Sequence, residues 1–122
     1  MALNYVSVVS VYVTDQDRAV DFFVNKLGFE KTMDGPFGEG QRWIEVKAPD
    51  GQTTINLANA SEFGVTPGRF SGVSFYSDNV KATVEEMRSK GVEITEDANQ
   101  QPWGVQAQFK DPDGNGYVIV GK

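Results

Sequence analysis

The strongest constraint on the fold is a short motif that occurs twice at a wide spacing. The sequence reads KAPDG at residues 47–51 and KDPDG at residues 110–114, so its Lys, Pro, Asp and Gly recur after 63 positions (110 − 47 = 63). A chain that repeats over such a distance is built from copies of one supersecondary unit, and each copy buries its apolar surface against its own elements and its neighbour. We therefore predict a tandem duplication.

Each copy contains one helical pattern between an Asp and a Gly, at residues 15–28 and 78–91. Apolar residues follow the helical period there: Val20, Phe23 and Leu27 in the first copy, and Val80, Val84 and Met87 in the second. Asp15 and Asp78 are the predicted N-caps, because a carboxylate accepts hydrogen bonds from free backbone N–H groups and complements the helix dipole. Gly28 and Gly91 are expected to end the helices in the left-handed conformation.

One alternating stretch precedes each helix and three follow it. These predicted strands are VVSVY (8–12), FEKTMD (29–34), RWIEVK (42–47) and TTINLA (53–58) in the first copy, and GVSFY (72–76), VEITED (92–97), VQAQFK (105–110) and GYVIV (116–120) in the second. The Pro-Asp-Gly motif joins the last two strands of each copy and is typical of a hairpin. Each copy is therefore a βαβββ module.

The expected organisation is one α+β domain over residues 1–122. Its first module spans residues 1–58 and its second spans residues 70–122. Residues 59–69 form the connector, where the Pro67-Gly68 pair interrupts regular structure.

The paired βαβββ plan, together with VYVTDQDRAVDFFVNKLGFE (11–30) and FKDPDGNGYVIV (109–120), resembles the vicinal oxygen chelate superfamily. That superfamily includes glyoxalase I, bleomycin-resistance proteins and extradiol dioxygenases. The resemblance implies two tandem modules whose mixed sheets curl around a concave cavity, with the helices outside. It also implies a homodimer in which both chains line each site.

Metal-using members of that superfamily place ligands on the first and last strand of each module. The resemblance carries these positions to Val8, Asn56, Gly72 and Val118, where Asn56 is chosen by strand alternation because an ungapped count would give Ile55. Val and Gly offer no lone pair and Asn offers one neutral carbonyl, whereas a divalent metal needs several donors. The chain also has no His and no Cys. We predict no metal and no other cofactor, which argues against glyoxalase I or dioxygenase chemistry.

Strand alternation places aromatic and polar side chains on the face of each sheet away from the helix. The predicted ligand-binding residues are Ser10, Tyr12, Trp43, Asn56, Ser74, Tyr76, Trp103, Gln106 and Gln108, with Thr54 on the same face. This lining suits a flat or amphipathic organic ligand. In the alternative interpretation the Trp residues lie in a dimer interface or the core, the Tyr and Ser residues serve packing, and the Gln residues face solvent.

Residues 35–40, GPFGEG, are rich in glycine but do not lead from a strand into a helix. A phosphate-binding role is therefore not expected. We expect a loop with Phe37 at its tip.

We predict a protein of the bleomycin-resistance kind that binds a small drug-like molecule without a metal, rather than an enzyme. The alternative is a glyoxalase-like lyase or isomerase that uses Glu45 as a carboxylate base, because a carboxylate in an apolar cavity is a stronger base. Glu45 is otherwise an ordinary exposed strand residue. A third hypothesis is a module that binds another protein or responds to a metabolite.

Charge and hydropathy limit the partners. The chain has 11 Lys and Arg against 17 Asp and Glu, a net charge of −6. This charge disfavours nucleic acids and anionic membranes and favours a cationic ligand. No apolar run approaches the ~18 residues of a membrane span, and no basic region precedes the first apolar stretch. We predict a cytoplasmic homodimer that binds a small organic ligand, with no nucleic-acid or membrane partner.

Overall fold

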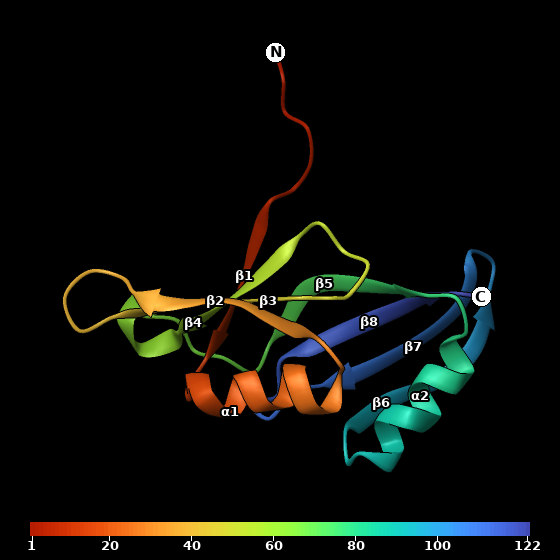
Figure 1. Ribbon diagram of the computed structural model, residues 1–122. Helices are drawn as coiled ribbons and strands as arrows, with labels where there is room; N and C mark the ends of the chain where they lie inside the picture. The colour runs from red at the N-terminus through yellow and green to blue at the C-terminus, as the bar shows by residue number, and fades with distance from the viewer. The chain divides into compact units, whose positions relative to one another are not determined.

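The computed structural model describes residues 1–122 and divides into two compact units, Met1–Pro67 and Gly68–Lys122 (Figure 1). The first unit contains β1 (Val8–Val13), α1 (Gln16–Asp21), the π-helix η1 (Phe22–Lys26), β2 (Glu30–Pro36), β3 (Arg42–Lys47), β4 (Thr54–Asn59) and the 3₁₀-helix η2 (Ala60–Phe63). The second contains β5 (Phe70–Ser77), α2 (Val80–Ser89), β6 (Glu93–Gln101), β7 (Gly104–Lys110) and β8 (Gly116–Gly121). This order confirms the predicted α+β fold of two tandem βαβββ modules.

The two units have the same sheet topology. Their four-stranded sheets are ordered β1-β4-β3-β2 and β5-β8-β7-β6, and neither closes into a barrel. The first strand of each module runs parallel to the last, and the other neighbours are antiparallel. The two Pro-Asp-Gly turns join β3 to β4 and β7 to β8, as predicted. The concave cavity shared by both modules stays a prediction.

Each unit buries the sheet face that packs against its own helix. Helix α1 contacts β4, whereas α2 contacts β6, β7 and β8. The buried strand residues on this face are Val11, Val13, Ile44, Val46, Ile55 and Leu57 in the first unit, and Ala107, Phe109, Tyr117 and Ile119 in the second. Most of them alternate with more exposed residues, as expected for a strand with one buried face. We call the opposite side of each sheet its helix-free face.

The predicted N-cap is confirmed in the first copy and shifted by one residue in the second, and Gly28 and Gly91 both adopt the predicted left-handed conformation, with φ of 74° and 82°. The Asp15 carboxylate accepts the backbone N–H of Arg18 at 3.0 Å. In the second copy Asn79, not Asp78, is the N-cap, and its Oδ1 accepts the N–H of Ala82 at 3.0 Å. An amide oxygen caps a helix as well as a carboxylate does, so residue type alone cannot choose between two adjacent caps.

The hairpin of β6 and β7 is longer than predicted. Residues 98–101 continue β6, and Gln101 pairs with Gly104, so Pro102 and Trp103 form the turn. Pro suits the first central position of a turn because its φ is already restrained. The hairpin therefore presents Trp103 at its tip, 65% exposed. Gly35 and Pro36 likewise belong to β2 rather than to the predicted loop.

In the second module the repeated turn is stabilised by hydrogen bonds to Asp111. The buried carboxylate of Asp111 accepts the backbone N–H groups of Asp113 and Asn115, the side-chain amide of Asn115 and the hydroxyl of Tyr117. Burial, together with the adjacent Asp111 carboxylate, raises the pKa of Tyr117 above its ordinary range. Ala48 occupies the corresponding position of the first turn. No helix of the chain has the length and apolar character of a membrane span.

Candidate functional site

The helix-free face of the first unit carries a row of side chains from four neighbouring strands. In the strand register Ser10 lies beside Asn56, Asn56 beside Glu45, and Glu45 beside Met33. Adjacent partners in a sheet point to the same side, so these four side chains share one face. Ile55 and Leu57, which flank Asn56 in β4, point to the other face and are buried. Met33 was not in the predicted set.

Glu45 joins two of its neighbours on this face. Its Oε2 accepts the indole N–H of Trp43 at 2.6 Å, and its Oε1 accepts the hydroxyl of Thr54 at 2.7 Å. The ring of Phe37 packs on Trp43, with 5.1 Å between the ring centres. Because each carboxylate oxygen already accepts a hydrogen bond, the arrangement favours Glu45 as a residue that orients Trp43.

Asn56 is buried, with 2% of its surface exposed. Its side-chain N–H group donates to the hydroxyl oxygen of Ser10 at 3.2 Å. Its Oδ1 is the one buried side-chain polar atom in the chain that has no hydrogen-bond partner. An unpaired buried carbonyl costs about 1–3 kcal/mol, which makes this atom a candidate contact for a ligand.

Tyr12 lies further along β1 on the same face, beside Ala58. Its ring meets that of Phe63 edge to face, with 5.7 Å between the ring centres. The tyrosine is half-buried, so the first unit places an aromatic surface at this end of the face. Sequence reasoning did not assign Phe63.

The second unit repeats this row with other side chains. Ser74 lies beside Val118, Val118 beside Gln108, and Gln108 beside Glu96. Val118 therefore corresponds to Asn56, although their numbers differ by 62 (118 − 56 = 62). The β3–β4 turn is one residue longer than the β7–β8 turn, since Lys47 pairs with Thr54 and Lys110 with Gly116.

Glu96 links the polar side chains of the second face. Its Oε1 accepts the amide N–H groups of Gln106 at 2.9 Å and Gln108 at 3.4 Å. The indole N–H of Trp103 donates to Oε1 of Gln106 at 3.0 Å. Sequence reasoning missed Glu96, because β-bulges on both sides of it break the strand alternation.

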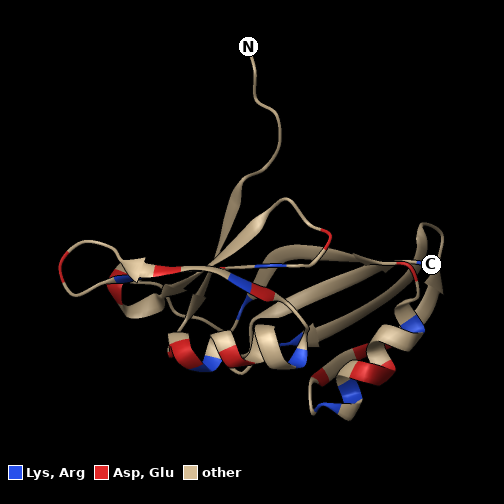
Figure 2. Cartoon of the chain, in the orientation of Figure 1, with Lys and Arg blue, Asp and Glu red and all other residues tan.

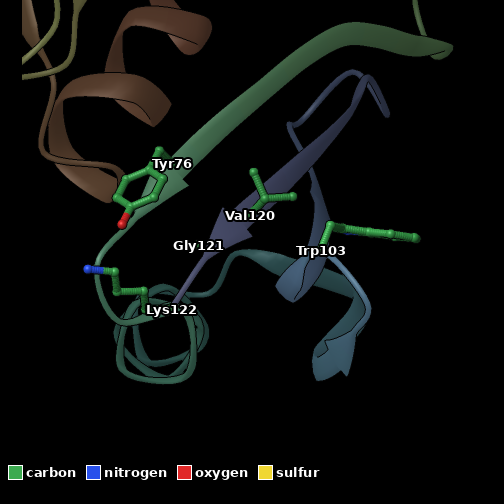
Figure 3. Close-up of a pocket in the computed structure, with 5 residues that line it drawn as sticks. All are labelled: Tyr76, Trp103, Val120, Gly121 and Lys122. Carbon is green, nitrogen blue, oxygen red and sulfur yellow. The ribbon is translucent and has the colours of Figure 1, made fainter.

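A pocket of about 430 Å³ opens at one end of this face (Figure 3). It is lined by Tyr76, Trp103, Val120, Gly121 and Lys122. Figure 3 shows Val120 between the two aromatic residues, and the polar ends of Tyr76 and Lys122 at the same side of the pocket. Of the predicted residues, Tyr76 and Trp103 line it, whereas Ser74, Gln106 and Gln108 do not.

The walls of this pocket are mostly uncharged. Tyr76 and Trp103 are 63% and 65% exposed. Figure 2 shows that β5 and β8 carry no charged residue, whereas both α-helices carry several. Lys122 is the single charged residue in the lining. Exposed aromatic rings beside an apolar floor suit a flat organic molecule.

The four positions that the family resemblance assigns to metal ligands hold side chains that do not suit a divalent metal. Val8, Gly72 and Val118 have no donor atom, and Asn56 offers one neutral carbonyl oxygen. Across the chain, no three His, Cys, Asp or Glu side chains come together in a group that could hold a metal ion. Together these four side chains offer one neutral donor, fewer than a divalent metal needs.

The chain is similar to known proteins over almost its whole length. Residues 3–119 match the family model described as "Glyoxalase/Bleomycin resistance protein/Dioxygenase superfamily". The chain is 31% identical over 117 residues to YetH of Bacillus subtilis (strain 168), and the match covers 96% of this chain and 98% of YetH.

Two solved structures are similar over nearly the whole chain. A member of the same superfamily from Sphaerobacter thermophilus DSM 20745 is 34% identical, with a TM-score of 0.92 and 98% of each chain covered. TnmS3 from Streptomyces sp. CB03234, described as an antibiotic binding protein, is also 34% identical, with a TM-score of 0.88 and coverage of 99% of this chain and 98% of TnmS3.

Proposed function

Because the chain belongs to the Glyoxalase/Bleomycin resistance protein/Dioxygenase superfamily, we propose that it binds a small aromatic or amphipathic molecule, such as an antibiotic, without a metal. The observation that carries the proposal is the pocket formed by Tyr76, Trp103 and Val120. Tyr and Trp offer large contact areas and lose little conformational entropy on binding, so they are common anchors for flat ligands.

Two further observations support a binding role over metal chemistry. The family's metal-ligand positions hold side chains that give at most one neutral donor, yet the surrounding faces keep Trp, Tyr, Gln and Glu side chains. Stacking and hydrogen bonds can hold a ligand through such groups without a Lewis acid. TnmS3, a structural relative, is itself described as an antibiotic binding protein.

The net charge of −6 sets a preference among ligands. A negative protein attracts cationic molecules over long distances and repels anions. The proposed ligand is therefore a neutral or cationic aromatic compound. Lys122 is located where it can contact a carbonyl or hydroxyl oxygen of that compound.

The proposal includes a homodimer in the cytoplasm. The pocket in the second unit is open, and a stable complex with a drug-sized ligand buries most of the ligand surface. A second copy of the chain would supply additional walls, as the family resemblance implies.

Titration with a panel of structurally different antibiotics tests the proposed function. Tryptophan fluorescence detects binding near Trp43 or Trp103, and calorimetry detects it anywhere. Saturable binding of at least one aromatic compound to wild-type protein is expected, with weaker binding to Trp103→Ala. Phe70→Ala is the matched control, because Phe70 is a similarly exposed aromatic residue of the second unit outside the pocket lining. The absence of any binder across the panel would contradict the proposal.

A further inference from the structure

We propose that Asn56, on the helix-free face of the first unit, binds a hydrogen-bond donor of an organic ligand, an N–H or O–H group, through its unpaired Oδ1; this inference rests on the proposed function. Asn56 is 2% exposed, and Oδ1 has no partner in the protein. Such an atom is costly to bury, because its hydrogen bond with water is lost and none replaces it. A ligand N–H or O–H would restore that bond.

Ser10 holds the Asn56 amide in place for this role. The Asn56 N–H group donates to the Ser10 hydroxyl oxygen at 3.2 Å, so the amide nitrogen is used within the protein. The remaining atom, Oδ1, is an acceptor only. A ligand with an N–H or O–H group satisfies it, and a ligand with only acceptors does not.

The neighbouring chemistry favours the same class of ligand. Glu45 is the direct partner of Asn56 on β3, and its carboxylate is also an acceptor. Ser10 lies on the other side of Asn56, in β1. The Glu45 carboxylate and the Asn56 carbonyl are therefore direct neighbours in the sheet, and no Lys or Arg lies in this row. This arrangement suits an amine better than a carboxylate or phosphate.

The Asn56 oxygen is covered, so a ligand reaches it by displacing a neighbouring side chain. The flanking side chains are those of Ser10 and Glu45. Movement of Glu45 away from Asn56 and toward the ligand amine would break its hydrogen bonds with Trp43 and Thr54. Binding at Asn56 should therefore change the fluorescence of Trp43 as well as release heat.

Two dyes of matched shape test this inference. Proflavine and acridine orange are both flat tricyclic cations with a ring N–H, but only proflavine carries further N–H donors, on its two outer amino groups, because those of acridine orange are dimethylated. Calorimetry with wild-type protein and Asn56→Leu gives four affinities. We expect Asn56→Leu to weaken proflavine binding about tenfold, the value of one good hydrogen bond, and to change acridine orange binding less than about twofold.

Control variants separate this role from a structural one. Gln52→Leu removes an exposed amide from the β3–β4 turn of the same unit, outside the row of site residues, and it should leave the ratio of the two dye affinities unchanged. Asn56→Leu should unfold at or above the wild-type temperature, because the unpaired carbonyl is gone. If Asn56→Leu does not fold, Ser10→Ala replaces it, because Ser10 is exposed. We expect Ser10→Ala to lower the ratio of proflavine affinity to acridine orange affinity about threefold.

The outcomes distinguish this inference from the proposed function. If both dyes bind and Asn56→Leu changes their affinities equally, the proposed hydrogen bond to Asn56 is wrong and the proposed aromatic binding stands. If wild-type protein binds neither dye, the proposed hydrogen bond to Asn56 is overturned, and the antibiotic panel decides the proposed function separately. A loss of affinity for proflavine alone in Asn56→Leu supports both the hydrogen bond to Asn56 and the proposed function.

Discussion

Trp43 donates its indole N–H to the Glu45 carboxylate at 2.6 Å, two residues further along β3. Thr54 donates to the other oxygen of the same carboxylate at 2.7 Å. One side chain thus orients an aromatic ring and ties β3 to β4 on the helix-free face.

Substitution of Glu45 tests this orienting role. Glu45→Leu leaves two donors without an acceptor, and we expect it to lower the free energy of unfolding by about 1–3 kcal/mol. Glu45→Gln should cost less, because its amide oxygen can still accept one hydrogen bond. Urea unfolding measures both variants. Equal losses for Leu and Gln would show that the hydrogen bonds contribute little.

Glu45→Gln also tests the catalytic alternative. An amide cannot act as a general base, so an enzyme that depends on Glu45 would lose turnover of an identified substrate. We expect the affinity for an uncharged aromatic ligand to change less than about threefold in Glu45→Gln, because the amide oxygen keeps one of the hydrogen bonds that orient Trp43 and Thr54.

Trp103 at the tip of the β6–β7 hairpin should contribute to affinity but not to stability. The side chain is 65% exposed, so Trp103→Ala is expected to unfold within about 0.5 kcal/mol of wild type. Affinity for an aromatic ligand should fall about tenfold with loss of ring stacking. Calorimetric titration gives the affinity. A large loss of stability with unchanged affinity would place Trp103 in the fold rather than the site.

Several features were predictable from the sequence because each depends on local chemistry. The Pro-Asp-Gly turns, the Asp15 cap and the apolar alternation of β1 all involve residues close in the chain. The assignment of Asn56 to the position that matches Val118 was less direct, because counting back the 63 residues of the repeat gives Ile55 (118 − 63 = 55). Strand alternation corrects the count, because a polar residue between two buried apolar ones faces the other side of the sheet.

Other features depend on pairings between distant residues, which periodicity does not reveal. Glu96 meets Gln106 and Gln108 because β6 continues to Gln101 and turns at Pro102. Two bulges then alter the register around Glu96, so alternation counted along β6 fails there. The Asp78 cap was wrong because Asn79, the next residue, is equally able to accept the N–H bond.

Tyr117 should make the fold sensitive to alkali. Its pKa is raised above the ordinary value of 10.0, first by burial and then by the Asp111 carboxylate. The protonated phenol is therefore favoured in the folded state, and its stabilising contribution is complete below about pH 10 and lost as the pH rises through the folded pKa. Unfolding measured against pH should show this loss in wild type.

Tyr117→Phe should remove that alkaline dependence. The variant also loses the hydrogen bond to Asp111, which we expect to cost about 1–3 kcal/mol near neutral pH. Tyr5→Phe is the control, because Tyr5 is exposed. An unchanged alkaline slope in Tyr117→Phe would assign the loss to another group.

Native mass spectrometry tests the proposed homodimer. We expect twice the chain mass of 13.4 kDa at micromolar concentration, with any retained organic ligand adding its own mass. A monomer alone would contradict the dimer and would require each chain to complete its pocket by itself.

The central claim is that the chain binds an aromatic ligand without a metal. The most direct measurement is a calorimetric titration of chelator-treated protein with the tightest binder of the antibiotic panel, repeated after addition of zinc, nickel, iron or manganese. We predict saturable binding with the same Kd in every case. Binding that appears only after a metal is restored would contradict the account.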